Sequence, residues 1–128
     1  MTVVLDSGAI SALAKDRDKL AVTRRRNHWP PLVPAVTLVE ALTGDQRRDV
    51  AANRLVRSCL VVEVDEVTSR RAARLRTATG RAGTISAVDA IVVATAEHRS
   101  DPLVLTSDPR DIAALSAHAN RPIRVESV

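Results

Sequence analysis

The 128-residue chain has the size of one globular domain, so we treat residues 1–128 as a single folding unit. Hydrophobic residues make up 45% of the chain and charged residues 27%, a balance that excludes an intrinsically disordered protein. The net charge is +4 and nearly all of the basic residues are arginine, which indicates an anionic partner. The absence of Phe and Tyr excludes most modules that stack single-stranded bases on aromatic rings.

The first residues, the longest apolar run and the cysteine content predict the cellular compartment of the protein. Its first residues run directly into Val3-Val4-Leu5-Asp6, without the basic region and long apolar stretch of a signal peptide. The longest nearly apolar run, Ala87–Ala96, is about half of the ~20 residues that a membrane span needs. A single cysteine, Cys59, excludes an internal disulfide. We therefore expect a cytoplasmic protein without membrane contact.

Short β-branched runs alternate with helical patterns along the whole chain. In order, strands are predicted at Val3–Asp6, near Leu32-Val33, at Leu60–Val64, at Leu103–Thr106 and, as a closing edge strand, at Ile123–Val125. Helices are predicted at Ser7–Ala14, Asp18–Arg26, Val36–Thr43, Asp45–Cys59, Asp65–Thr79, Ser86–His98 and Pro109–His118. This alternation predicts an α/β fold, with a central parallel sheet of about five short strands and helices on both faces. In such sheets, ligands bind beyond the carboxyl ends of the strands.

Four acidic residues lie where predicted strands end or helices begin, namely Asp6, Glu40, Asp89 and Asp108. Each has a purely structural interpretation. Asp6 and Asp108 are natural helix N-caps, while Thr37–Glu40 and Ser86–Asp89 both fit the capping-box pattern. For any one of these acids taken alone, capping is the better interpretation.

The surroundings of Asp89 and Glu40 favour a further role. Both lie in largely apolar helical runs and have no basic residue three or four positions away, so a carboxylate there needs a partner from elsewhere. Asp6 and Asp108 are expected at the same sheet edge. Gathered carboxylates require a cation, and all-oxygen ligands favour Mg²⁺ or Mn²⁺. A hard metal beside helix N-termini, which attract phosphate, is suited to phosphodiester hydrolysis.

Four segments carry a family resemblance, in the order Val3-Val-Leu-Asp-Ser-Gly-Ala, Val36-Thr-Leu-Val-Glu-Ala, Ala87-Val-Asp-Ala-Ile-Val-Val-Ala-Thr-Ala and Val104-Leu-Thr-Ser-Asp-Pro-Arg-Asp. Over nearly its full length the chain resembles a PIN domain, and within that family a VapC-type toxin, the ribonuclease of a bacterial toxin–antitoxin pair. The resemblance implies that Asp6, Glu40, Asp89 and Asp108 form an acidic quartet that binds one or two Mg²⁺ or Mn²⁺ ions for hydrolysis of RNA by a metal-activated water. It implies supporting roles for Ser7, Thr106 and Asp111, a homodimer, and a cognate VapB-type antitoxin.

Other residues and other functions stay open. Most arginines of the two clusters, at positions 47–57 and 70–81, are expected on solvated faces, and Arg81, in a glycine-flanked loop before Asp89, is the best candidate for substrate binding. Trp29 suits an interface and the core equally, and Cys59 suits packing. The alternatives are a non-catalytic α/β interaction or RNA-binding domain whose acids only cap helices, and a DNA-cutting nuclease of the same superfamily.

Overall fold

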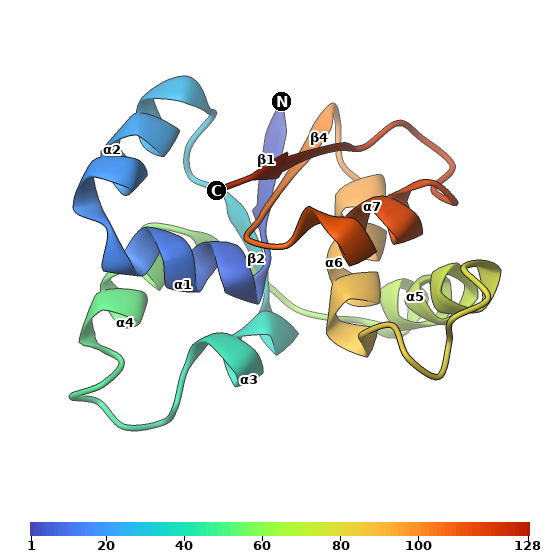
Figure 1. Cartoon of the computed structure of the whole chain (residues 1–128), viewed down its shortest axis with the longest axis horizontal. Helices are drawn as coiled ribbons and strands as arrows, with labels where there is room; N and C mark the ends of the chain where they lie inside the picture. Colours follow the sequence, from blue (N-terminus) through green and yellow to red (C-terminus); the bar gives the residue numbers. More distant parts are fainter.

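The computed structural model describes all 128 residues and contains one five-stranded sheet, in which every pair of neighbouring strands is parallel (Figure 1). The strand order is β3-β2-β1-β4-β5, so β1 lies at the centre. The strands are β1 (Thr2–Leu5), β2 (Leu32–Pro34), β3 (Leu60–Val62), β4 (Pro102–Thr106) and β5 (Arg124–Ser127). The predicted parallel sheet and its closing edge strand are confirmed.

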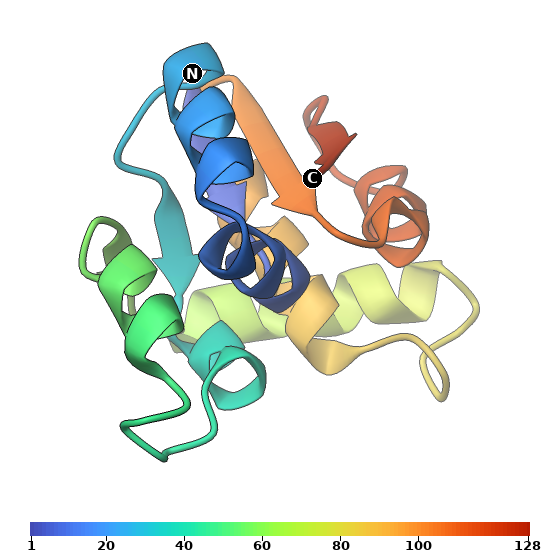
Figure 2. The same ribbon diagram turned by 60° about the vertical axis from the view of Figure 1, so that its left-hand side comes forward.

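Seven α-helices cover both faces of the sheet, as predicted (Figures 1 and 2). They are α1 (Ser7–Lys15), α2 (Arg17–Arg26), α3 (Leu38–Ala41), α4 (Val50–Val56), α5 (Glu66–Ala78), α6 (Ala87–Glu97) and α7 (Pro109–Ser116). Helices α1 to α4 lie to one side of the sheet and α5 to α7 to the other. No helix combines the length and the apolar character that crossing a membrane requires.

Two apolar cores follow from the alternation of side chains along the strands. Val4 and Val104 face the helices α5, α6 and α7, where they pack with residues such as Ile112. Val3 and Leu105 face the opposite way and pack against α1 and α4. Each of these side chains is essentially buried, and full burial of one such side chain is worth about 1.5–3 kcal/mol. The sheet is therefore held from both faces.

The helix predicted at Asp45–Cys59 is wrong in its extent, because α4 begins only at Val50. The cause is the carboxylate of Asp49, which accepts hydrogen bonds from the backbone N–H groups of Thr43 and Gly44, each at 2.9 Å. These bonds fold residues 43–49 into a turn, with Gly44 at a φ of 84°. An acid that looked like part of an amphipathic helix instead closes the loop before it.

The helix predicted at Val36–Thr43 is also broken, into a 3-10 turn at Ala35–Thr37 and the short helix α3. Thr37 is fully buried and its hydroxyl donates to the carbonyl of Pro34 at 2.8 Å, so its side chain caps no helix. The capping-box interpretation of Thr37 and Glu40 is therefore wrong, and Glu40 is released from that role. The other predicted elements differ from the observed ones only at their ends.

Cys59 and Trp29 both pack against the core on the α1 side of the sheet. Burial raises the pKa of the Cys59 thiol to about 11, so the thiol is not a reactive thiolate at neutral pH. The guanidinium of Arg24 lies 5.2 Å from the centre of the Trp29 ring. Packing thus describes both residues.

Candidate functional site

Asp6 and Asp108 follow the two neighbouring strands β1 and β4, at the carboxyl edge of the sheet. Asp6 is the N-cap of α1 and accepts the N–H of Ala9 at 2.7 Å, while Asp108 is the N-cap of α7 and accepts the N–H of Arg110 at 3.3 Å. The hydroxyl of Thr106 accepts the N–H of Asp108 at 3.1 Å and fixes this turn. Both predicted caps are confirmed, and each leaves part of its carboxylate uncommitted.

Burial raises the pKa of Asp6, against the lowering effect of hydrogen bonding by the Thr106 hydroxyl and the Ala9 N–H. The nearby charge of Glu40 raises it further. Asp6 is only 5% exposed, so this is an acid held in a dry position. Such a carboxylate gains more from an added cation than an exposed one does.

Gly8 allows the turns that carry Asp6 and Asp108 to approach each other. A Cβ atom at Gly8 would stand 2.1 Å from the Ser107 hydroxyl oxygen and 3.2 Å from the Ser107 Cβ. With the Ser107 hydroxyl where it stands, only glycine avoids that overlap, because it has no side chain. The sequence marked no role for Gly8, and the only signal was its place two residues after Asp6.

Glu40 comes from α3 and is exposed, which differs from the largely apolar setting expected from its neighbours. Its Oε1 accepts a hydrogen bond from the hydroxyl of Ser7 at 3.0 Å. Ser7 is the first residue of α1, so this bond ties Glu40 to the helix that Asp6 caps. The predicted supporting residue thus orients Glu40.

Asp89 lies in the first turn of α6 and is half-buried. Its backbone N–H donates to the Ser86 hydroxyl at 3.2 Å, but its carboxylate accepts no hydrogen bond from the chain. Burial, followed by the charges of neighbouring carboxylates, raises the pKa of Asp89 to about 6; those carboxylates are, in decreasing order, Asp6, Glu40, Asp111 and Asp108. We call these five residues the acidic cluster.

One cation of the chain, the guanidinium of Arg81, lies beside the acidic cluster. Nη1 of Arg81 lies 3.0 Å from Oδ1 of Asp111, an ion pair between the α5–α6 loop and the first turn of α7. The remaining acids of the cluster have no ion pair. Arg81 was predicted as a substrate contact. In the structure, its ion pair with Asp111 places it beside the acidic cluster.

The donor set of the cluster is made of carboxylate and hydroxyl oxygens, which suits Mg²⁺ or Mn²⁺ better than zinc. As the side chains stand, no three acidic, histidine or cysteine groups lie close enough to hold one ion together. Magnesium commonly takes only one or two protein carboxylates and keeps several waters. The residues therefore fit a hydrated divalent ion rather than a closed protein cage.

Most of the arginines in the 70–81 cluster are committed to the fold. Arg70 pairs with Glu66 at 2.9 Å on the exposed face of α5, as expected. Arg76 donates through Nε and Nη2 to the carbonyl of Ile85, at 3.1 and 2.9 Å, and braces the chain just before α6. Arg71 donates to both oxygens of Glu97, each at 2.7 Å. The sequence carried no local signal for these last two partnerships.

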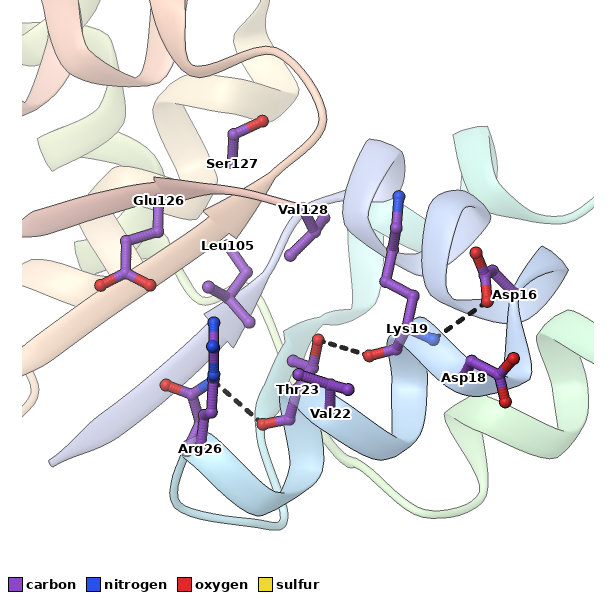
Figure 3. Close-up of a pocket in the computed structure, with 11 residues that line it drawn as sticks. Asp16, Asp18, Lys19, Val22, Thr23, Arg26, Leu105, Glu126, Ser127 and Val128 are labelled. Carbon is purple, nitrogen blue, oxygen red and sulfur yellow. Dashed lines mark hydrogen bonds between the residues drawn. The ribbon is translucent and has the colours of Figure 1, made fainter.

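The largest pocket of the molecule, about 500 Å³, lies away from the acidic cluster, between α2 and the carboxyl-terminal strand β5 (Figure 3). Its walls carry charges of both signs, from Asp16, Asp18 and Glu126 against Lys19 and Arg26. No acid of the cluster lines it. The largest pocket and the acidic cluster therefore lie in different places. We take the acidic cluster as the candidate functional site, because its carboxylates have perturbed pKa values.

Comparisons with known proteins agree with this architecture. The model of the PIN domain family matches residues 3–117. The fold is similar to that in the crystal structure of DNA-bound VapBC from Salmonella typhimurium, with a TM-score of 0.74, 18% identity, and coverage of 99% of this chain and 98% of that chain. It is also similar to PAE2754 from Pyrobaculum aerophilum, with a TM-score of 0.64, 19% identity, and coverage of 97% and 83%. No curated protein matches the sequence.

Proposed function

Since its family model spans residues 3–117, the chain belongs to the PIN domain family, and on that premise we propose that it is a divalent-metal-dependent endoribonuclease, the toxin of a type II toxin–antitoxin pair. The observation that carries this proposal is that the half-buried carboxylate of Asp89 has no partner in the chain. Burial and four other carboxylates raise its pKa to about 6, and no hydrogen bond or ion pair of the chain relieves its charge. If these acids served only structural roles such as capping, they would have no reason to lie close enough to raise one another's pKa.

Asp6 and Asp89 are the proposed direct ligands of Mg²⁺ or Mn²⁺. Glu40, oriented by Ser7, and Asp108, fixed by Thr106, would complete the site directly or through water. A divalent ion bound there would supply a water of lowered pKa and neutralise charge on the phosphate in the transition state. The chain's own contribution is to hold the oxygen donors at the edge where α1, α6 and α7 begin, with helix N-termini that attract phosphate.

The likeness to a VapBC structure across nearly the whole chain supports an antitoxin partner, which we propose to be of the VapB type. A homodimer is the second assembly that we propose. Neither assembly is needed for the cleavage test, because all five acids belong to one chain.

Cleavage of total RNA tests the proposal. The wild-type chain is expected to cut RNA with Mg²⁺ or Mn²⁺ and not with EDTA. Asp6→Asn and Asp89→Asn should each lower the cleavage rate by at least about a hundredfold. Asn caps a helix almost as well as Asp, so Asp6→Asn should keep a cooperative melting transition. Cleavage at the wild-type rate by Asp6→Asn would refute its role as a ligand.

A matched control variant is available in α2. Asp16 is its N-cap and accepts the N–H of Lys19 at 2.9 Å, in the same way that Asp6 caps α1. Asp16 is not among the carboxylates that raise the pKa of Asp89, so Asp16→Asn should cleave RNA at the wild-type rate. Equal losses in both variants would show that the effect comes from capping.

The two alternatives give different results in the same assays. A non-catalytic interaction domain would cut nothing, and neither Mg²⁺ nor Mn²⁺ would raise its melting temperature. A DNA-cutting relative would prefer DNA when RNA and DNA of matched sequence are compared.

A further inference from the structure

One guanidinium of the chain, that of Arg81, reaches the acidic cluster. It lies in the loop between α5 and α6 and pairs with Asp111 across the entrance to α6. The charge of Asp111 in turn acts on Asp89. The family resemblance implies a supporting role for Asp111, and its ion pair with Arg81 in this structure indicates what that role is.

The backbone of Arg81 is anchored, so its side chain starts from a fixed place. The carbonyl of Arg81 accepts the N–H groups of Thr84 at 2.9 Å and of Ile85 at 2.8 Å. The carbonyl of Ile85 is held by both Nε and Nη2 of Arg76. Gly80, at a φ of 70°, allows the sharp turn before Arg81. These hydrogen bonds hold the loop, and so they fix the position from which the Arg81 side chain extends.

The guanidinium of Arg81 keeps unused donors. It makes one ion pair, through Nη1, and no hydrogen bond to any other group of the chain, and its side chain is 45% exposed. The guanidinium of Arg71, by contrast, donates hydrogen bonds to Glu97 and to the carbonyl of His118. An arginine that is held on one side and open on the other presents a planar pair of donors, which suits a phosphate group.

We propose that Asp111 is a positioning residue and not a metal ligand, and that it holds Arg81 at the rim of the acidic cluster to bind a backbone phosphate of the RNA strand. This inference rests on the proposed function, because RNA is its ligand. A phosphate that approaches five carboxylates is repelled by their negative charges. Arg81 offers that phosphate a cation supplied by the chain.

The proposal predicts an unusual sign for one substitution. Loss of a negative charge should ordinarily tighten RNA binding. If Asp111 holds Arg81 in place, Asp111→Asn should instead weaken it, by about as much as Arg81→Gln does. The double variant should bind no more weakly than Arg81→Gln alone, since both changes remove one interaction.

The test is the affinity for a short labelled RNA, measured by fluorescence anisotropy in EDTA, where no cleavage occurs. We expect Arg81→Gln and Asp111→Asn to lose about tenfold in affinity and to lower the slope of log K against log salt by about one contact. Arg70→Gln is the matched control, since it removes the same charge from an exposed pair on α5 and should change affinity less than twofold. Affinity for Mn²⁺, measured by calorimetry without RNA, should change less than threefold in Asp111→Asn.

Three results would overturn the proposal. They are tighter RNA binding by Asp111→Asn, RNA binding by Arg81→Gln that equals that of Arg70→Gln, and a loss of Mn²⁺ affinity in Asp111→Asn as large as in Asp6→Asn. A wild-type chain that binds no RNA in EDTA would overturn it as well. Cleavage with Mg²⁺ reports separately on the proposed function, so failure of one statement is distinguishable from failure of the other.

Discussion

Helix α6 carries one carboxylate near each end, and the two have opposite surroundings. Asp89, in the first turn, accepts no hydrogen bond, and burial together with four like charges raises its pKa to about 6. Glu97, the last residue, is 5% exposed, and it accepts two hydrogen bonds from Arg71 and one from the Asn120 N–H. Hydrogen bonding by Arg71 lowers the pKa of Glu97.

The contrast shows how an acid of the fold differs from an acid of a site. Glu97 is buried with its counter-charge inside the chain, and it ties α6 to α5 and to the segment before β5. Asp89 is left without one, at a cost to stability that nothing in the chain offsets. A carboxylate of the second kind is a candidate for binding something from outside the chain.

The largest expected effect is at the structural end of α6. Glu97→Ala leaves the partly buried Arg71 without a counter-charge and should lower the free energy of unfolding by about 3–5 kcal/mol, measured by urea denaturation. Glu66→Ala is the control, because it breaks the exposed pair with Arg70 and should cost close to nothing. A small loss in Glu97→Ala would mean that the ion pair contributes no more than a surface contact, and the contrast between the ends of α6 would disappear.

A middle-sized effect is expected at Gly8, where the two turns of the acidic cluster touch. Gly8→Ala places a methyl group against Ser107 and should lower the free energy of unfolding by about 1–3 kcal/mol. RNA cleavage should fall as well, because Asp6 and Asp108 move apart. The double variant Gly8→Ala/Ser107→Ala removes the hydroxyl that stands in the way and should recover much of both losses. No recovery would place the cause elsewhere than in this contact.

The smallest expected effect is a gain of stability at the other end of α6. In metal-free protein at pH 7, Asp89→Asn removes an unfavourable charge and should raise the free energy of unfolding by about 1 kcal/mol, after allowance for solvent screening at a half-exposed group. Because the folded pKa of Asp89 is above its ordinary value of 3.8, the wild-type carboxyl is protonated more readily when folded. The stability penalty is therefore absent below about pH 4, builds up as the pH rises from about 4 to about 6, and is complete above that.

Urea denaturation of both proteins in EDTA between pH 4 and pH 7 measures this effect. The advantage of Asp89→Asn should be present at pH 7 and vanish at pH 4. Glu97 works in the opposite sense, since its lowered pKa gives stability that is lost as the pH falls. An advantage of Asp89→Asn that did not vary with pH would contradict the electrostatic explanation.

Local rules were sufficient for the parallel sheet, for most of the helices and for the positions of Asp6 and Asp108. The alternation of β-branched runs and helices predicts parallel strands, and an Asp directly after a strand must lie at the carboxyl edge of such a sheet. Asp6 and Asp108 were therefore placed correctly by sequence position alone, together with their capping roles. Asp89 and Glu40 were expected near the same edge because their helices begin there, whereas Asp111 entered only through the family resemblance.

Local rules failed where a side chain acts on distant or non-helical backbone. Asp49 has the spacing of a helical residue but bonds the turn at Thr43 and Gly44. Arg71 and Glu97 are 26 positions apart, and no periodicity links them. Gly8 matters only because Ser107 lies against it in the folded chain. Each of these depends on tertiary contacts, which short-range patterns do not encode.

The pairing of β1 with β4 runs residue by residue, from Thr2 opposite Pro102 to Leu5 opposite Leu105. Asp6 directly follows Leu5, the last residue of β1, and Asp108 lies two positions beyond Thr106, the last residue of β4. Adjacent strands lie about 4.8 Å apart whatever side chains they carry. The backbone ladder thus sets where these two acids begin, and the contact of Gly8 with Ser107 sets how closely the turns that carry them then approach.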